Sequence, residues 1–293
     1  MRFDSPCCNC FAGAALVCSM LSAPLPVKAQ SFVTGSTNAV AAVAKPNIVT
    51  VTAHDFAFDV PRSIPAGLTT FRLRNKGKQL HHFMLIRVEG GKTAAEALQV
   101  LIKTGQGVRP RWMHPVGGPN AISPGGEATS TLILEPGTYL AFCEVPGPDP
   151  APHFTKGMAK EFTVPPPRRT ESLPKADLSI KLTDFDFVFS KPLTKGRHVI
   201  AVTNTGSQPH MLYINRNPPG KGNKDVLDWA NDPKGKSVPG QGVGGVTEIE
   251  LRCVASYRLR HLHARRRRIA GRCGGLDARG TRLLGCRDRA RAK

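Results

Sequence analysis

The chain has 293 residues, of which 40% are hydrophobic and 21% charged, and its formal net charge is +20. These fractions are those of a globular protein, and the length is sufficient for two domains of ordinary size. The charge does not point to a nucleic-acid partner, because residues 252–293 carry 13 Arg and 1 Lys against 2 Asp, which accounts for +12 of the total.

The first 29 residues have the pattern of a secretory signal peptide. Arg2 gives a positive start, residues 11–25 are apolar but too short and too rich in proline to cross a membrane, and Ala29 ends a plausible cleavage site. A lipoprotein signal at Cys18 is less favoured, because Val17 stands where a small residue is expected. We therefore predict a periplasmic or secreted protein, cleaved after Ala29 and without membrane contact afterwards.

Cleavage would leave a single cysteine in the body of the mature chain. Four of the eight cysteines precede the cleavage site (Cys7, Cys8, Cys10, Cys18) and three lie in the basic tail (Cys253, Cys273, Cys286). Only Cys143 lies between them. An exported protein with one body cysteine is not built on disulfides, so this thiol needs another explanation.

The chain repeats itself at a spacing of 129 residues. The residues Phe56, Phe58, Gly67, Asn75, Gly77 and His81 are each matched 129 positions later, by Phe185, Phe187, Gly196, Asn204, Gly206 and His210. Chance seldom matches so many residues of these types at one offset. The repeat predicts two copies of the same fold in tandem.

Each copy begins with short segments in which apolar or β-branched residues alternate. In the first copy these segments are 48–51, 69–74, 83–88, 129–134, 138–143 and 162–164, and in the second they are 179–182, 198–203 and 211–215. Residues 93–103 have the apolar face of a helix, and 225–229 form a shorter counterpart. We predict an all-β chain of two tandem Greek-key β-sandwich domains, each with a short inserted helix.

The domain boundaries follow from these patterns. We predict a signal peptide at 1–29, a flexible leader at 30–45, a first domain at 46–166, a proline-stiffened linker at 167–176, a truncated second domain at 177–251 and an Arg-rich tail at 252–293. The strand pattern stops after residue 251, so we attribute the tail to a shifted reading frame and expect it to be disordered. The alternative is a genuine basic arm for phosphates or anionic lipid. No aromatic residues for base stacking accompany its arginines, so no nucleic acid is expected.

The first copy gathers metal-ligand residues near its end, in the pattern Cys143-x9-His153-x4-Met158. Two imidazoles and one thiolate in a trigonal arrangement, with a long axial thioether, are the ligands of a blue-copper centre. The second imidazole must come from a neighbouring strand. The pattern therefore predicts a copper site that a histidine elsewhere in this copy completes.

His81 and His82 are the candidates for that histidine. Adjacent residues on a strand point to opposite faces, so only one of them should reach the metal. The match between His81 and His210 at the repeat spacing favours His81. His82 is the second choice.

With His81 as the first ligand, the first copy resembles the cupredoxin family, which includes plastocyanin and the type-1 copper domains of nitrite reductases. In that family an Asn/Gly turn, here Asn75 to Gly77, precedes the first histidine ligand, and Cys, His and Met follow around the last loop. The resemblance covers about residues 46–165 and implies one type-1 copper held by His81, Cys143, His153 and Met158. The second copy keeps His210 without a Cys or Met partner before the tail, so we expect it to be metal-free.

The resemblance implies a carrier of single electrons that meets a redox partner protein in the cell envelope, most naturally through His153. The alternative is a non-redox binding module or a copper carrier. Two-domain relatives include multicopper oxidases and nitrite reductases, but Phe142 and Glu144 flank Cys143 where an oxidase has histidines, and His-x-His occurs only at 261–263. We therefore predict that the protein is not an enzyme and has no catalytic residues.

Overall fold

The computed structural model describes residues 45–105, 109–166, 172–194, 196–233, 236, 238–250, 253–259 and the backbone of 269–272. The predicted signal peptide, its cleavage site after Ala29, and nearly all of the leader lie outside these residues, as does most of the predicted tail.

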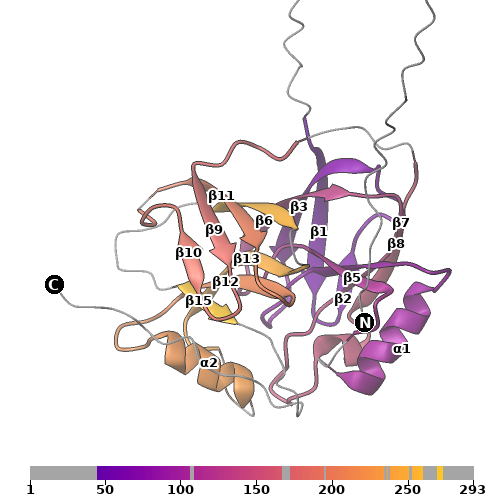
Figure 1. Cartoon of the computed structure of the whole chain (residues 1–293). Helices are drawn as coiled ribbons and strands as arrows, with labels where there is room; N and C mark the ends of the chain where they lie inside the picture. Colours follow the sequence, from indigo (N-terminus) through magenta and orange to yellow (C-terminus); the bar gives the residue numbers. More distant parts are fainter. Residues whose placement is uncertain are drawn as a thin grey trace, which may run out of the picture. The chain divides into compact units, whose positions relative to one another are not determined.

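Strands dominate both halves of the described chain (Figure 1). The first half contains β1 (Asn47–His54), β2 (Ala57–Asp59), β3 (Gly67–Asn75), β4 (Met84–Val88), α1 (Ala94–Thr104), β5 (Met113–Gly117), β6 (Glu127–Leu134), β7 (Gly137–Phe142), the 3-10 helix η1 (His153–Lys156) and β8 (Ala159–Val164). The second half contains β9 (Leu178–Leu182), β10 (Phe187–Phe189), β11 (His198–Asn204), β12 (His210–Arg216), α2 (Asn223–Asn231), β13 (Gln241–Ile249), β14 (Val254–Leu259) and β15 (Ile269–Arg272). The all-β fold with one short helix in each half is confirmed.

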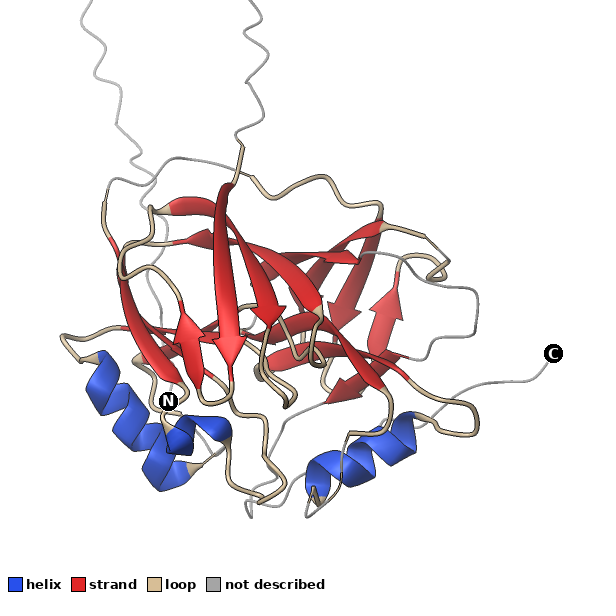
Figure 2. Ribbon diagram, turned by 180° about the vertical axis from the view of Figure 1, so that it is seen from behind, coloured by secondary structure: helices blue, strands red, loops and turns tan. Residues whose placement is uncertain are grey.

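Two sheets build the sandwich (Figure 2). One has the strand order β10-β9-β11-β14-β6-β3-β1-β2, and the other has the order β15-β12-β13-β5-β4-β7-β8. Burial alternates along the strands; in β1, for example, Val49, Val51 and Ala53 are buried and their neighbours are not. This period of two places one face of each strand in the core.

Strands from the two halves meet within both sheets. Ser256 and Tyr257 of β14 pair with Thr131 and Ser130 of β6, and β13 pairs with β5 at a single position. One hydrophobic cluster contains buried residues from both halves. The division into two domains with a linker at 167–176 stays a prediction, and residues 167–171 of that linker are not described.

The helices lie at the same end of the strands (Figures 1 and 2). Helix α1 begins with a capping box, in which Thr93 Oγ1 accepts from the Glu96 N–H and the Glu96 carboxylate accepts from the Thr93 N–H. It packs Ala97 and Leu101 against the first half. No helix within the described residues is long and apolar enough to cross a membrane.

Strand β14 departs from the sequence expectation, because it lies beyond residue 251. Ala255, Tyr257 and Leu259 are buried, and the Tyr257 hydroxyl donates to the Val243 carbonyl at 2.7 Å. The backbone of β15 pairs with β12 still further along the chain. The expected disorder from residue 252 onward is therefore wrong for these two strands. Whether the reading frame is shifted stays a prediction.

Candidate metal centre

Three of the predicted ligands meet inside the first half. His81, Cys143 and His153 are fully buried, and their ligand atoms all lie within 4.8 Å of one another. The two Nδ1 atoms are 3.1 Å apart, and the Cys143 Sγ lies 3.6 Å from Nδ1 of His153 and 4.0 Å from Nδ1 of His81. The three side chains therefore converge on one point.

These separations are those of a trigonal site around a single ion. Metal bonds of about 2.0 Å to imidazole nitrogen and about 2.3 Å to thiolate sulfur, as zinc forms them, place the ligand atoms of such a site about 3.5 to 3.8 Å from one another. The observed 3.1, 3.6 and 4.0 Å span that range. The buried cluster fits one type-1 copper site.

Hydrogen bonds on the far side of each imidazole turn its Nδ1 toward the cluster. The His81 Nε2–H donates to Asp55 Oδ1 at 2.9 Å, because an ionised carboxylate can only accept. The His153 Nε2–H donates to Gln79 Oε1 at 3.0 Å. With Nε2 protonated in both rings, two Nδ1 lone pairs face each other across 3.1 Å and require a cation or a proton between them.

The Asn/Gly turn predicted before the first ligand holds His81 in place. The Asn75 side chain donates to the carbonyls of Gln79 and Ile122 and accepts from the Gly77 N–H. A Cβ atom at Gly77 would lie 2.4 Å from Asp55 Oδ1 and 2.7 Å from His81 Nε2. Position 77 is therefore glycine because the Asp55–His81 hydrogen bond occupies the space that a side chain would need.

The proline-rich loop brings His153 back to Cys143. Cys143 follows β7 directly, and the loop closes by a bridge between Pro146 and Pro152. The His153 N–H then donates to the Val145 carbonyl at 3.0 Å, and η1 begins at His153. The prolines stiffen a hairpin that holds the two ligands side by side.

Met158 lies at the end of the same loop, immediately before β8. Its side chain is fully buried. Its N–H donates to the His153 carbonyl, and its carbonyl accepts from the Cys143 N–H, both at 3.1 Å. The backbone of Met158 is therefore hydrogen-bonded to both loop ligands, His153 and Cys143.

Burial shifts the pKa values of the three clustered side chains. It lowers the pKa of His153 to about 4, with help from the positive charges of His81 and Lys156, and it raises the pKa of the Cys143 thiol to about 12. Burial also lowers the pKa of His81, although Asp55 opposes the shift. These shifts favour uncharged imidazoles, which can ligate a metal, near neutral pH, and a metal held by Cys143 would have to displace the thiol proton.

His153 is shielded from solvent, contrary to its expected role as the ligand nearest the surface. The ring of Phe56 packs edge-on against it with centroids 5.4 Å apart, and Lys156 Nζ lies 5.0 Å from the Phe56 ring centroid. Phe56 has a φ of 68°, a left-handed value that bulky residues seldom adopt. The Phe56 ring and the Gln79 side chain therefore both contact His153.

His82 does not join the cluster. Its Nε2 accepts a hydrogen bond from the Glu144 N–H at 3.0 Å, and its ring is outside the group of ligand atoms that lie within 4.8 Å of one another. The structure therefore places His81, and not His82, beside Cys143 and His153.

The second half repeats the surroundings of His81 without the cluster. His210 is buried and its Nε2–H donates to Asp184 Oδ1 at 3.0 Å. A Cβ at Gly206 would lie 2.4 Å from both of these atoms. Within the described residues, His81, Cys143 and His153 are the one group of three or more His, Cys, Asp or Glu side chains that could hold a metal ion. His210 therefore has no comparable partners there.

Sequence reasoning missed Asp55 and Gln79. Both carry a signal, because Asp184 and Gln208 stand 129 positions later, the same offset that relates His81 to His210. Extending the repeat comparison to polar residues beside the histidines would have found them.

Comparisons with known proteins concern the fold. No family model and no curated protein sequence matches the chain. Among solved structures, reduced auracyanin from Roseiflexus castenholzii is 24% identical over 42% of this chain and 99% of its own, with a TM-score of 0.30. Auracyanin A, a blue copper protein from Chloroflexus aurantiacus, is 21% identical over 41% of this chain and 99% of its own, again with a TM-score of 0.30.

Larger copper proteins match more of the chain. A copper nitrite reductase from Nitrosomonas europaea is 17% identical over 74% of this chain and 85% of its own, with a TM-score of 0.25. A blue copper oxidase from the same organism is 16% identical over 75% of this chain and 77% of its own, with a TM-score of 0.26. At such TM-scores, the assignment of the site depends on its own geometry.

The same comparisons correct one prediction. The chain was expected not to be an enzyme, because histidines do not flank Cys143. Its structural neighbours over about three quarters of its length include an oxidase and a nitrite reductase, so that exclusion does not hold. Phe142 and Glu144 argue only against the histidine-flanked cysteine that an oxidase has at that position.

Proposed function

We propose that the protein is a type-1 (blue) copper protein of the periplasm or the extracellular space, which binds one copper and transfers single electrons to and from a redox partner protein. The ligands would be His81, Cys143, His153 and Met158. The observation that carries the proposal is the convergence of two imidazole Nδ1 atoms and one cysteine sulfur on a single buried point. The signal-peptide pattern supports the location.

Bound copper would supply a one-electron couple, and the chain's own residues determine how easily that couple works. Asp55 and Gln79 fix the orientation of the two imidazoles, and the loop hairpin fixes Cys143 against His153. The full burial of all three ligand residues excludes water. Because the ligand side chains are held so firmly, their positions would change little between the two oxidation states of copper, and a small rearrangement favours rapid electron transfer.

The same burial weighs against the alternative of a copper carrier that hands its ion to another protein. A carrier must release copper, and here no ligand atom is at the surface. Release would need the Pro146–Pro152 hairpin to open.

Copper stoichiometry and redox cycling test the proposal. The full chain, reconstituted with Cu(II) and freed of excess metal, should hold one copper per chain and pass reversibly through a one-electron reduction. His210→Ala is the matched control and should leave both results unchanged. A bound copper that cannot be cycled reversibly, or binding that depends on His210, would refute the assignment.

A further inference from the structure

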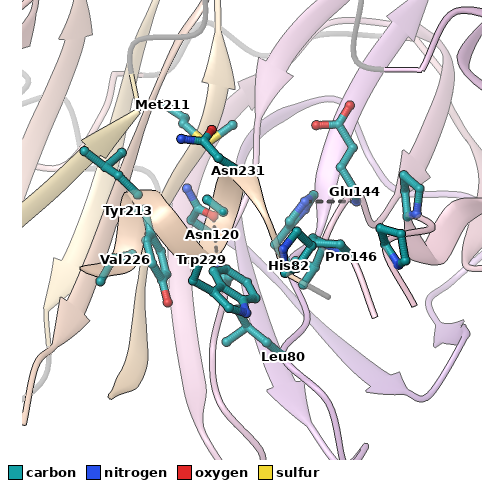
Figure 3. A pocket seen from close by; sticks show the side chains of 17 residues that line it. Leu80, His82, Asn120, Glu144, Pro146, Met211, Tyr213, Val226, Trp229 and Asn231 are labelled. Atoms are coloured by element: carbon teal, nitrogen blue, oxygen red, sulfur yellow. Dashed lines mark hydrogen bonds between the residues drawn. The ribbon is translucent and has the colours of Figure 1, made fainter. Parts of the chain in front are cut away.

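A second feature lies beside the metal centre and plays no part in holding the metal. It is a pocket of about 350 Å³ between the loop after Cys143 and helix α2 (Figure 3). This volume is within the range of small-molecule sites, which begins at about 300 Å³.

One wall of the pocket is continuous with the metal centre. It contains Glu144, which follows Cys143, and His82, which follows His81. Pro146 and Pro152, the two ends of the loop hairpin, extend the same wall. An occupant would therefore touch the residues next to two of the proposed ligands.

The opposite wall comes from the second half of the chain and is aromatic and apolar. Trp229 and Val226 project from α2, and Met211 and Tyr213 project from β12 (Figure 3). Flat aromatic rings and proline rings provide stacking surfaces for another ring. The shape and composition of this wall favour a planar, apolar occupant.

Three of the polar side chains that border the pocket, Asn120, His82 and Glu144, are held by other parts of the chain. The Asn120 amide donates to the carbonyls of Leu212 and Val246, and its oxygen accepts from the Ala121 N–H. His82 accepts from the Glu144 backbone, and the Glu144 carboxylate pairs with Arg109 at 2.7 Å. A charged ligand would lose its hydration here without gaining a counter-ion, which is costly.

We propose that this pocket binds a small uncharged aromatic molecule of one or two rings, stacked on Trp229. The binding itself needs no copper. A second consequence rests on the proposed function: an occupant pressed against Glu144 and Pro146 would change the optical spectrum of copper bound at Cys143.

Tryptophan fluorescence of the metal-free protein tests the binding. The chain has two tryptophans, so Trp112→Phe leaves Trp229 as the only reporter. In this background phenol should quench the emission saturably. Cyclohexanol, an aliphatic alcohol, and benzoate, an anion, should bind at least tenfold more weakly than phenol.

Two variants of α2 locate the effect. Ala230→Phe places a ring in the pocket wall and should weaken phenol binding at least tenfold. Lys224→Phe adds the same ring at an exposed position of the helix and should leave the affinity within twofold of the parent. Circular dichroism verifies folding. If Ala230→Phe does not fold, Trp229→Leu replaces it, with calorimetry as the readout and a fivefold loss as the expected result.

Quenching that rises linearly without saturation, or an affinity that neither pocket variant changes, would overturn the proposal. The phenol titration is independent of the metal. A chain that binds phenol and fails to bind copper would therefore contradict the proposed function and leave the pocket assignment intact.

Discussion

Replacing Asp55 by asparagine separates the orientation of the His81 ring from the general stability of the fold. Asp55 Oδ1 accepts from the His81 Nε2–H at 2.9 Å, and the same carboxylate accepts from the N–H groups of Lys78 and Gln79. Asparagine preserves the shape and removes the charge. Partners of this kind are worth 10- to 100-fold in metal affinity, or about 1.4 to 2.7 kcal/mol. We expect Asp55→Asn to lose copper affinity by that factor.

The second half supplies a matched control for this change. Asp184 accepts from the His210 Nε2–H at 3.0 Å and binds Ser207 as Asp55 binds Lys78, but no cluster lies beyond His210 in the described residues. Each variant should lose about 1 kcal/mol of unfolding free energy, the difference between a charged and a neutral acceptor. Only Asp55→Asn should weaken copper binding.

Competition with a chelator measures the copper affinity of both variants, and urea unfolding of the metal-free proteins measures their stability. Equal losses of copper affinity in Asp55→Asn and Asp184→Asn would refute the reasoning. An Asp55→Asn protein that binds copper as tightly as the parent would refute it as well.

Three further outcomes are expected. His81→Ala should abolish copper binding whereas His82→Ala should retain it, as measured by bound copper after gel filtration; the reverse result would make His82 the ligand. Met158→Leu conserves volume, so it should cost less than about 1.5 kcal/mol of stability in urea, yet it should shift the reduction potential, and an unchanged potential would exclude an axial thioether. The metal-free protein should lose stability as the pH falls from 6.5 to 4. Burial lowers the pKa of His153 to about 4, so the unfolded chain takes up its proton first in that window, and the loss approaches about 3 kcal/mol. His153→Gln should flatten this dependence, and an unchanged slope would show that His153 is not its source.

The ligands on one loop could be predicted because they are close in sequence. Cys143, His153 and Met158 have fixed spacings, and their residue types define the chemistry. The sequence distinguishes His81 only through the repeat, and Asp55 carries the same signal, because Asp184 stands 129 positions later. The spacing of the ligands within the first copy carries no information about such partners, because Asp55 reaches His81 across a turn.

The burial of His153 and the pocket beside α2 depend on contacts that no local pattern contains. Phe56 covers His153 only because its backbone takes a left-handed conformation. The wall that Trp229 provides faces the copper loop because strands of the two halves meet in common sheets. In the tail, the strand around Tyr257 is short and borders an Arg-rich segment, so its pattern did not stand out in the sequence.

The visible absorption spectrum of the copper-loaded chain tests the central claim most directly. A thiolate bound to Cu(II) at the proposed site should give an intense charge-transfer band, and Cys143→Ser should remove that band while the protein stays folded. A folded protein that binds copper without the band, or a band that survives in Cys143→Ser, would contradict the assignment of His81, Cys143 and His153 as a blue-copper centre.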